Sequence, residues 1–381
     1  MFFVFGIGIA IFLELLLILK KNKSVADHVL GAWLLLDVLH LSLFYLNYSD
    51  AIFDYPHLAG LGFGMPTAQG VFLFLYAKAL TTGSLSWKTI VFHLLPAFLI
   101  YIFATPFFIL SAEEKVCVME NKGAGYEWFV YLNNTVMIIT GFSYAIWTFL
   151  LTKRYSKIIR TRFSNIDKKE LNWLKYLSIA MSIIWITVLF SDKSEIIFGV
   201  VVLFIFFIGG FGINQMSIFS SQPETSEIKV VDFESSNIHQ SIEVVDEVLD
   251  TPEKPKKRYA KSGLTAEKSD IIFGKLNQIM ATDKLFLNNE LTLSQLAEAL
   301  ETPSNHLSQV INEKGNKNFY TYINTLRVNE FIRISKLPEN KNITLIAMAY
   351  ESGFNSKSTF NKHFKAVIGK TPQEYLNNEN I

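Results

Sequence analysis

Long runs of apolar residues fill the first 215 positions of the chain, whereas polar and charged residues dominate positions 216–381. Each of seven runs has about the length of a helix that crosses a hydrocarbon core, which takes about 20 residues with a range near 17–25. The runs cover residues 2–19, 27–47, 60–80, 89–110, 128–151, 174–190 and 196–213. Because lipid cannot satisfy free backbone groups, we expect every run to be a helix. The pattern predicts a seven-helix transmembrane domain over residues 1–215.

The positions of Lys and Arg between the runs predict the orientation. The first, third and fifth connections hold eleven of these residues, and the second, fourth and sixth hold three. Because connections rich in Lys and Arg stay in the cytoplasm, we expect the N-terminus outside and the C-terminal part inside. Basic residues follow the first run instead of preceding it, which argues against a cleaved signal peptide. The expected location is the inner (cytoplasmic) membrane, with several crossings.

Composition limits the class of protein further. Half of the residues are hydrophobic, 18% are charged, the mean hydropathy is +0.27 and the net charge is +1. Ordinary soluble domains carry roughly 25% charged residues, so a fully soluble globule and a disordered chain are both disfavoured. A single cysteine, Cys117, excludes an internal disulfide and a four-thiolate zinc site. We expect neither a metal nor a cofactor.

Residues 216–262 form an expected linker between the apolar and polar halves. This stretch mixes Ser, Glu, Pro and Lys without a sustained period, and it ends in a basic cluster at 254–261. We interpret it as a flexible, charged tether. The basic cluster also suits contact with anionic lipid or with DNA phosphate.

A repeat marks the polar end of the chain. Residues 296–300 align with 348–352 at an offset of 52, and after the following turn Leu307 aligns with Phe360 at an offset of 53. Each copy reads as a short helix, a tight turn and a second, amphipathic helix, at about 292–313 and about 344–368. In such a helix-turn-helix the second helix enters the DNA major groove. The repeat therefore predicts two DNA-reading motifs in one domain.

Local signals mark the ends of these helices. Thr292 with Gln295 predicts a capping box, and Thr302-Pro303 predicts a cap and a first-turn proline before the first reading helix. Ser356 is expected to cap the second reading helix, and Thr371 with Glu374 to open the last helix. The segment at about 319–335 predicts a rigid connecting helix, about 25 Å long at 1.5 Å per residue. Adjacent major-groove faces recur about 34 Å apart, so its scale suits two reading heads.

At this point the chain resembles a known family. Residues 263–381 are similar to the DNA-binding domain of AraC/XylS-type transcriptional regulators. The residues that carry the likeness are Leu293-Ser-Gln-Leu-Ala-Glu-Ala-Leu300, Ser304-x-x-Leu307-Ser308, Phe319-x-x-Tyr322-Ile-Asn324, Leu326-Arg327, Ala349-Tyr-Glu-Ser-Gly353-Phe354, Ser356-x-Ser358-x-Phe360, Phe364-Lys365 and Gly369-Lys-Thr371-Pro372-x-Glu374-Tyr375. More loosely, the whole layout is similar to that of membrane-embedded bacterial members of this family.

The resemblance implies which side chains meet DNA. The base-reading positions are Asn305, Ser308, Gln309, Lys357, Ser358, Asn361 and Lys362. Asn and Gln can form two hydrogen bonds with adenine, and Lys can reach guanine. His363, Lys365 and Lys370 are the expected phosphate contacts.

Three features depart from the family or limit its use here. Glu301 occupies the first turn, where the family usually has glycine, and the first reading helix lacks the arginine often found there. The charge of residues 263–381 is 13 basic minus 12 acidic, or +1, so non-specific DNA affinity should be modest. For Arg327 the family implies a structural partner and not a base.

Polar residues within the apolar runs offer a candidate sensor site. Asp37, His40, Glu14 and Gln69 lie in or near the expected spans, where ionisable groups are costly and face the bundle interior or a water-filled cavity. Asp37 and His40 share a helical face, so they suit either a ligand contact or a buried pair that bonds neighbouring helices. The acidic connection at 111–127 is the largest expected external surface and a second place for a signal to bind.

The sequence therefore favours an all-α, membrane-anchored one-component transcriptional regulator that binds double-stranded DNA and senses an unidentified signal. Paired half-sites would suit a homodimer. No Gly-rich phosphate loop, His-Glu-x-x-His or Gly-x-Ser-x-Gly motif indicates an enzyme. Two alternatives stay open: a transporter or channel with a secondary DNA-binding tail, and a tethered factor released by proteolysis within 216–262.

Overall fold

The computed structural model describes residues 1–121, 123–167, 171–191, 193–214, 264–340 and 342–379. Within these ranges every element is a helix, and the only bridge is an isolated antiparallel pair between Phe163 and Thr292. The expected all-α class is confirmed for the described residues. The expected linker at 216–262, with its basic cluster, lies outside them.

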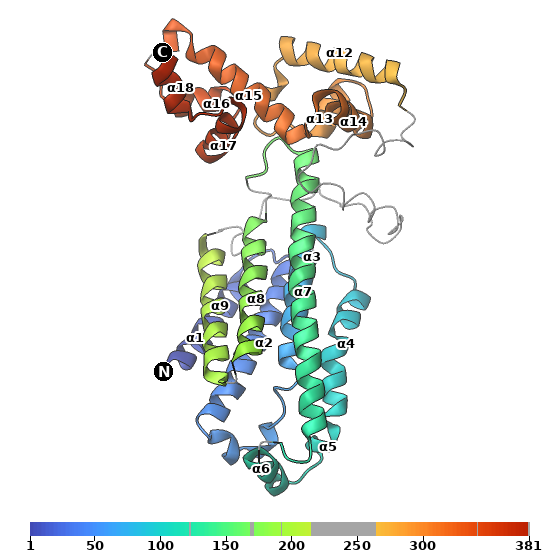
Figure 1. The fold of residues 1–381 in the computed structure, drawn as a ribbon, viewed down its shortest axis with the longest axis vertical. Coiled ribbons are helices and arrows are strands. Elements are labelled where there is room, and N and C mark those ends of the chain that lie inside the picture. The colour runs from blue at the N-terminus through green and yellow to red at the C-terminus, as the bar shows by residue number, and fades with distance from the viewer. Residues whose placement is uncertain (122, 168–170, 192, 215–263, 341, 380–381) are drawn as a thin grey trace. The chain divides into compact units, whose positions relative to one another are not determined.

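The chain divides into two compact units, which we describe separately. The described part of the first comprises residues 1–154 and 171–214, and that of the second comprises residues 155–167 and 264–379. The helices of the first unit are α1 (Phe2–Leu19), α2 (Val25–Tyr48), η1 (Ala51–Asp54), η2 (Pro56–Leu58), α3 (Met65–Thr82), α4 (Trp87–Phe103), α5 (Thr105–Phe108), α6 (Ala112–Glu120), α7 (Glu127–Arg162), α8 (Asn172–Phe190) and α9 (Ser194–Asn214) (Figure 1). Helix α7 continues into the second unit from Tyr155 onward.

In the first unit most sequence-adjacent helices pack against each other, and the first helix also packs against the last described one. Helix α1 packs on α2 and α9, α2 on α3, and α8 on α9. Their core contains Trp33, Leu34 and Leu41, all completely buried. Large apolar side chains also point outward: Phe92 is 71% exposed and Phe190 is 87% exposed. A surface of this kind is unusual for a protein that is solvated by water on all sides.

Among the described residues, four helices are long and apolar enough to cross a membrane: α1, α2, α7 and α8. The count of seven spans stays a prediction. The expected fourth span, 89–110, is divided, because α4 ends at Phe103 and the four-residue helix α5 begins at Thr105. Pro106 in the first turn of α5 has no backbone N–H to continue the α4 ladder, which accounts for the break.

The second unit contains the remaining helices of the described residues. They are α12 (Ala266–Thr282), η4 (Leu285–Leu287), α13 (Leu293–Ala299), α14 (Ser304–Gly315), α15 (Phe319–Ser335), η5 (Pro338–Asn340), α16 (Leu345–Glu351), α17 (Lys357–Ile368) and α18 (Pro372–Glu379). Helix α15 lies between the α13–α14 pair and the α16–α17 pair (Figure 1). Its first half joins the apolar core around Leu296 and Leu307, and its second half joins the core around Phe360 and Phe364. The long helix thus holds two small helical subdomains together.

Most helix ends follow their local sequence signals. The Thr292–Gln295 capping box is present, the Ser356 hydroxyl accepts the Thr359 N–H, and Thr371 and Glu374 cap each other. The prediction of a cap at Thr302 was wrong. Helix α14 begins at Ser304, and Pro303 stands in the capping position without a side-chain hydrogen bond.

Candidate nucleic-acid interface

Helix α17 presents a polar face to solvent and an apolar face to the core. Lys357, Ser358, Asn361 and Lys362 are exposed. The opposite face carries Phe360 and Phe364, which are buried against Phe331 of α15. Because the apolar stripe fixes the rotation of the helix, all four predicted base-reading residues of α17 lie on its outward face. Of the predicted phosphate contacts, Lys365 and Lys370 are exposed as well.

The first reading helix, α14, is less open than its sequence suggests. Asn305 is exposed and Ser308 is half-buried. Gln309 is only 5% exposed, and its side-chain N–H donates to the Glu313 carboxylate at 3.1 Å. A base contact from Gln309 would require this hydrogen bond to break, whereas Asn305 can reach outward as the helix stands.

His363 lies inside the domain and not on its surface. Its ring is 7% exposed and packs edge-on against Tyr320 of α15, with ring centroids 4.8 Å apart. Burial lowers the pKa of His363 to about 4, helped by the nearby cations of Lys362, Arg160 and Arg327, while Asp167 acts in the opposite direction. The imidazole is therefore neutral at physiological pH, and the predicted phosphate contact would need the ring to turn outward. In its neutral form the ring could donate only one uncharged N–H to a phosphate.

The turns of the two motifs share one backbone conformation despite different residues. Glu301 has φ +51° and Gly353, its counterpart in the repeat, has φ +90°. Glycine enters this left-handed region without a steric cost, whereas glutamate does not. The geometry of the first turn is thus preserved without the glycine that the family usually has there, and it holds some backbone strain.

Arg327 is buried in the domain core, where it is the centre of a hydrogen-bond network. It is 2% exposed and donates hydrogen bonds to the carbonyl oxygens of Phe286 and Asn288, each at 2.8 Å. Further donations reach the Asn324 amide oxygen at 3.2 Å and both oxygens of Ser164. Burial lowers the pKa of Arg327 to about 10, against the opposing effects of Tyr320 and Glu290, so the guanidinium stays charged at neutral pH. The implied structural role fits this geometry.

Sequence reasoning missed a group of residues outside the two motifs. Ser164 and Asp167, in the segment after α7, make hydrogen bonds within the second unit to Arg327, Ser356 and Thr359. The sequence Ser164-Asn-Ile-Asp167 has the composition of an ordinary polar loop, so no local signal could have singled it out.

Two of the four candidate sensor residues of the first unit, Asp37 and Gln69, are hydrogen-bonded to each other. The Gln69 amide donates to the Asp37 carboxylate at 2.7 Å and accepts the Trp33 indole N–H at 2.6 Å, all three being buried. His40 instead packs against the Phe198 ring, and Glu14 lies beside Gly31. Asp37 therefore links α2 to α3 through Gln69, as expected of a buried group that bonds neighbouring helices, whereas His40 contacts α9 through Phe198.

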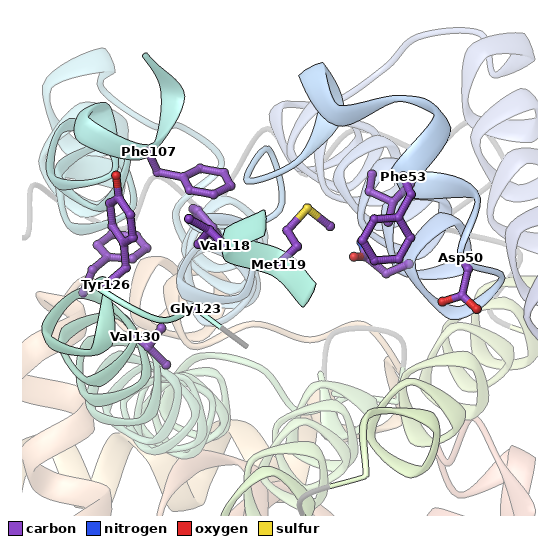
Figure 2. A pocket seen from close by; sticks show the side chains of 12 residues that line it. Asp50, Phe53, Phe107, Val118, Met119, Gly123, Tyr126 and Val130 are labelled. Atoms are coloured by element: carbon purple, nitrogen blue, oxygen red, sulfur yellow. The ribbon is translucent and has the colours of Figure 1, made fainter. Parts of the chain in front are cut away.

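A cavity lies at the end of the first unit that contains the 111–127 connection. Its volume is about 350 Å³. Most of its lining is apolar or aromatic, and the side chains come from α2, η1, α5, α6 and α7 (Figure 2). The lining includes Asn47, Asp50, Phe53, Phe107, Met119 and Tyr126. Asp50 gives one edge a carboxylate, and the apolar and aromatic remainder of the lining suits a small aromatic or apolar group.

Comparison with known proteins identifies only the C-terminal part. Residues 296–378 match the family model described as a helix-turn-helix domain. Uncharacterised HTH-type transcriptional regulators from Staphylococcus aureus strains COL, MSSA476 and N315 are each 31% identical over 101 residues. Each match covers 26% of this chain and 13% of the relative, so the chain spans about an eighth of their length. No solved structure matches the chain. Together with the paired helical motifs around α15, the match shows that the chain ends in a helix-turn-helix domain.

Proposed function

We propose that this chain is a membrane-anchored, sequence-specific DNA-binding transcriptional regulator of the AraC/XylS type. The observation that carries the proposal is the pair of helix-turn-helix motifs joined by α15, with polar side chains exposed on α14 and α17. Asn305, Ser358, Asn361 and Lys362 are the proposed base contacts, and Lys365 and Lys370 the proposed phosphate contacts. The names of the relatives as HTH-type transcriptional regulators support the same role.

Anchoring rests on the apolar surface of the first unit. In the part of the chain that the structure describes, four helices meet the length and composition of a membrane span, and side chains as large as Phe92 and Phe190 point outward. In lipid such a surface carries no cost, whereas in water it would drive aggregation. We propose the orientation in which the C-terminal domain faces the cytoplasm and its DNA, because Lys and Arg gather in the first, third and fifth connections.

DNA reading is tested with the full-length protein in detergent micelles or lipid nanodiscs. Duplexes selected from a random library should bind more tightly than unselected ones. Lys362→Ala should weaken binding to the selected duplex by about 1–3 kcal/mol and relax the preference at one base position. Lys268→Ala removes an exposed Lys from α12, outside the reading helices, and serves as the matched control. Equal affinity for every duplex, or equal effects of the two variants, would refute sequence reading by α17.

Sensing is proposed for the aromatic cavity of the first unit. Its lining comes from the connections that the charge pattern puts outside, including the one at 111–127. A ligand there would contact α5, α6 and α7 at once, so binding could shift their packing. Met119→Trp should fill the cavity and fix reporter transcription at one level whatever the growth medium. Phe92→Trp, at an outward-facing position, is the control. A normal response in Met119→Trp would place the signal elsewhere.

A further inference from the structure

The last turns of α7 and the segment that follows them belong to the DNA-binding unit. Residues 155–167 belong to the same compact unit as the two helix-turn-helix motifs, although more than 100 residues of sequence separate them. Arg160 is the first anchor: its guanidinium carbon lies 5.8 Å from the centroid of the Tyr320 ring. Tyr320 in turn packs against His363 of the second reading helix.

Ser164 is the central anchor and is completely buried. Its N–H and its hydroxyl both donate to the Leu291 carbonyl, at 3.2 and 2.6 Å. Its carbonyl oxygen accepts from Asn324 at 3.1 Å and from Arg327 at 3.3 Å, and its hydroxyl oxygen accepts a second Arg327 N–H at 3.2 Å. Five hydrogen bonds to one buried serine mark a specific docking site, since each buried polar atom must find its partner.

Asp167 links this docked segment to the second reading helix through two hydrogen bonds. One carboxylate oxygen accepts the Ser356 hydroxyl and the other accepts the Thr359 hydroxyl, each at 2.6 Å. Ser356 caps α17 and Thr359 lies in its first turn, so the negative charge sits at the positive end of the helix. Asn165 helps to fix the position of Asp167, because its side chain accepts the Asp167 N–H and donates to the Glu290 carboxylate.

This position is one that a DNA phosphate would use. Helix N-termini and Ser or Thr hydroxyls are common phosphate contacts, and the first residues of a reading helix meet base edges. Ser358, a proposed base contact, lies next to the site: its hydroxyl is 3.2 Å from that of Ser356. A carboxylate and a phosphate cannot both occupy these hydroxyls, because the two anions repel each other.

We propose that residues 160–167 are an intramolecular competitor of DNA, so that docking of Asp167 on Ser356 and Thr359 holds the second reading helix off its site. This inference rests on the proposed DNA-binding function. Helix α7 supplies a route for control, since the helix that leads into the docked segment also carries the cavity-lining residues Phe129 and Val130. A signal that moves α7 would then release residues 160–167 from the second reading helix or dock them on it.

The test compares full-length wild type, Asp167→Asn and Glu339→Gln in nanodiscs. Asp167→Asn removes the competing charge at an exposed position and leaves the helix cap in place, so it should bind the selected duplex about tenfold more tightly. Glu339→Gln removes one exposed carboxylate from η5 and should change affinity by less than about twofold. In the wild type, DNA should also accelerate amide exchange of residues 160–167 by about tenfold, since the Ser164 N–H is released.

The outcomes separate the two proposals. If wild type and Asp167→Asn bind the selected duplex with equal affinity, or if Asp167→Asn binds more weakly, the competition is overturned and DNA reading stands. Unchanged exchange at 160–167 in the DNA complex would overturn it too, because the segment would then stay docked. If no duplex is preferred by either protein, the proposed function itself fails, and the competition falls with it.

Discussion

The turns at Gly353 and Glu301 should respond in opposite ways: adding a side chain at Gly353 should destabilise its motif, and removing the side chain at Glu301 should stabilise the other. At Gly353, φ is +90° and a Cβ would lie 2.7 Å from the Phe286 oxygen and 2.9 Å from the Leu287 Cα. An L-residue in the left-handed region costs about 1–2 kcal/mol, and forcing η4 backbone aside adds roughly 1–3 kcal/mol. Gly353→Ala should therefore destabilise the second motif by about 3 kcal/mol.

Glu301→Gly should act in the other direction. The exchange relieves about 1–2 kcal/mol of left-handed strain and adds about 0.5–1 kcal/mol of chain entropy cost. The net gain for the first motif should be about 0.5–1 kcal/mol. Gly369→Ala is the matched control for steric contact: its φ is +81°, but no atom lies within 4 Å of the added Cβ. It should cost about 1 kcal/mol, so the difference from Gly353→Ala measures the collision with η4.

Amide hydrogen exchange of the full-length protein provides the assay, because it reports opening of each motif separately. About 3 kcal/mol corresponds to roughly a 100-fold loss of protection in α16 and α17, since 1.4 kcal/mol is tenfold. Equal losses in Gly353→Ala and Gly369→Ala would refute the packing argument. Destabilisation of α13 and α14 by Glu301→Gly would refute the strain argument.

Two further predictions concern the buried polar groups of the second unit. Because the pKa of His363 is lowered to about 4 in the fold, the unfolded chain binds the extra proton first, so stability should be constant above about pH 6.5 and fall by at most about 3 kcal/mol as the pH drops to 4. His363→Phe should remove this fall in stability between about pH 6.5 and 4, measured as the unfolding temperature over a pH series. If the variant keeps the same slope, other groups cause the fall. Arg327→Lys should cost about 2–4 kcal/mol in unfolding experiments, because an ammonium cannot replace the forked contacts to Phe286, Asn288 and Ser164. A loss below about 1 kcal/mol would mean that water can replace the network.

Local features of the sequence determined where the helices lie along the chain. Apolar runs and caps such as Thr292 with Gln295 act over a few residues, so they mark helices wherever the chain later packs. The repeat is also visible in the sequence, because the apolar residues Leu307 and Ile311 recur as Phe360 and Phe364 at the same offset. Hydrophobic periodicity also fixes the outward face of α17, which is why Lys357, Ser358, Asn361 and Lys362 were found exposed.

Contacts between distant segments were decided only by the tertiary structure. Gln69 pairs with Asp37 across 32 residues, and Asp167 meets Ser356 and Thr359 across about 190. Such polar contacts leave no periodic trace, since one hydrogen-bonding residue among many polar neighbours looks like any other. The burial of Gln309 and His363 and the left-handed turn at Glu301 belong to the same class. Periodicity says which face of a helix is apolar, but the neighbour that covers its edges is set by packing.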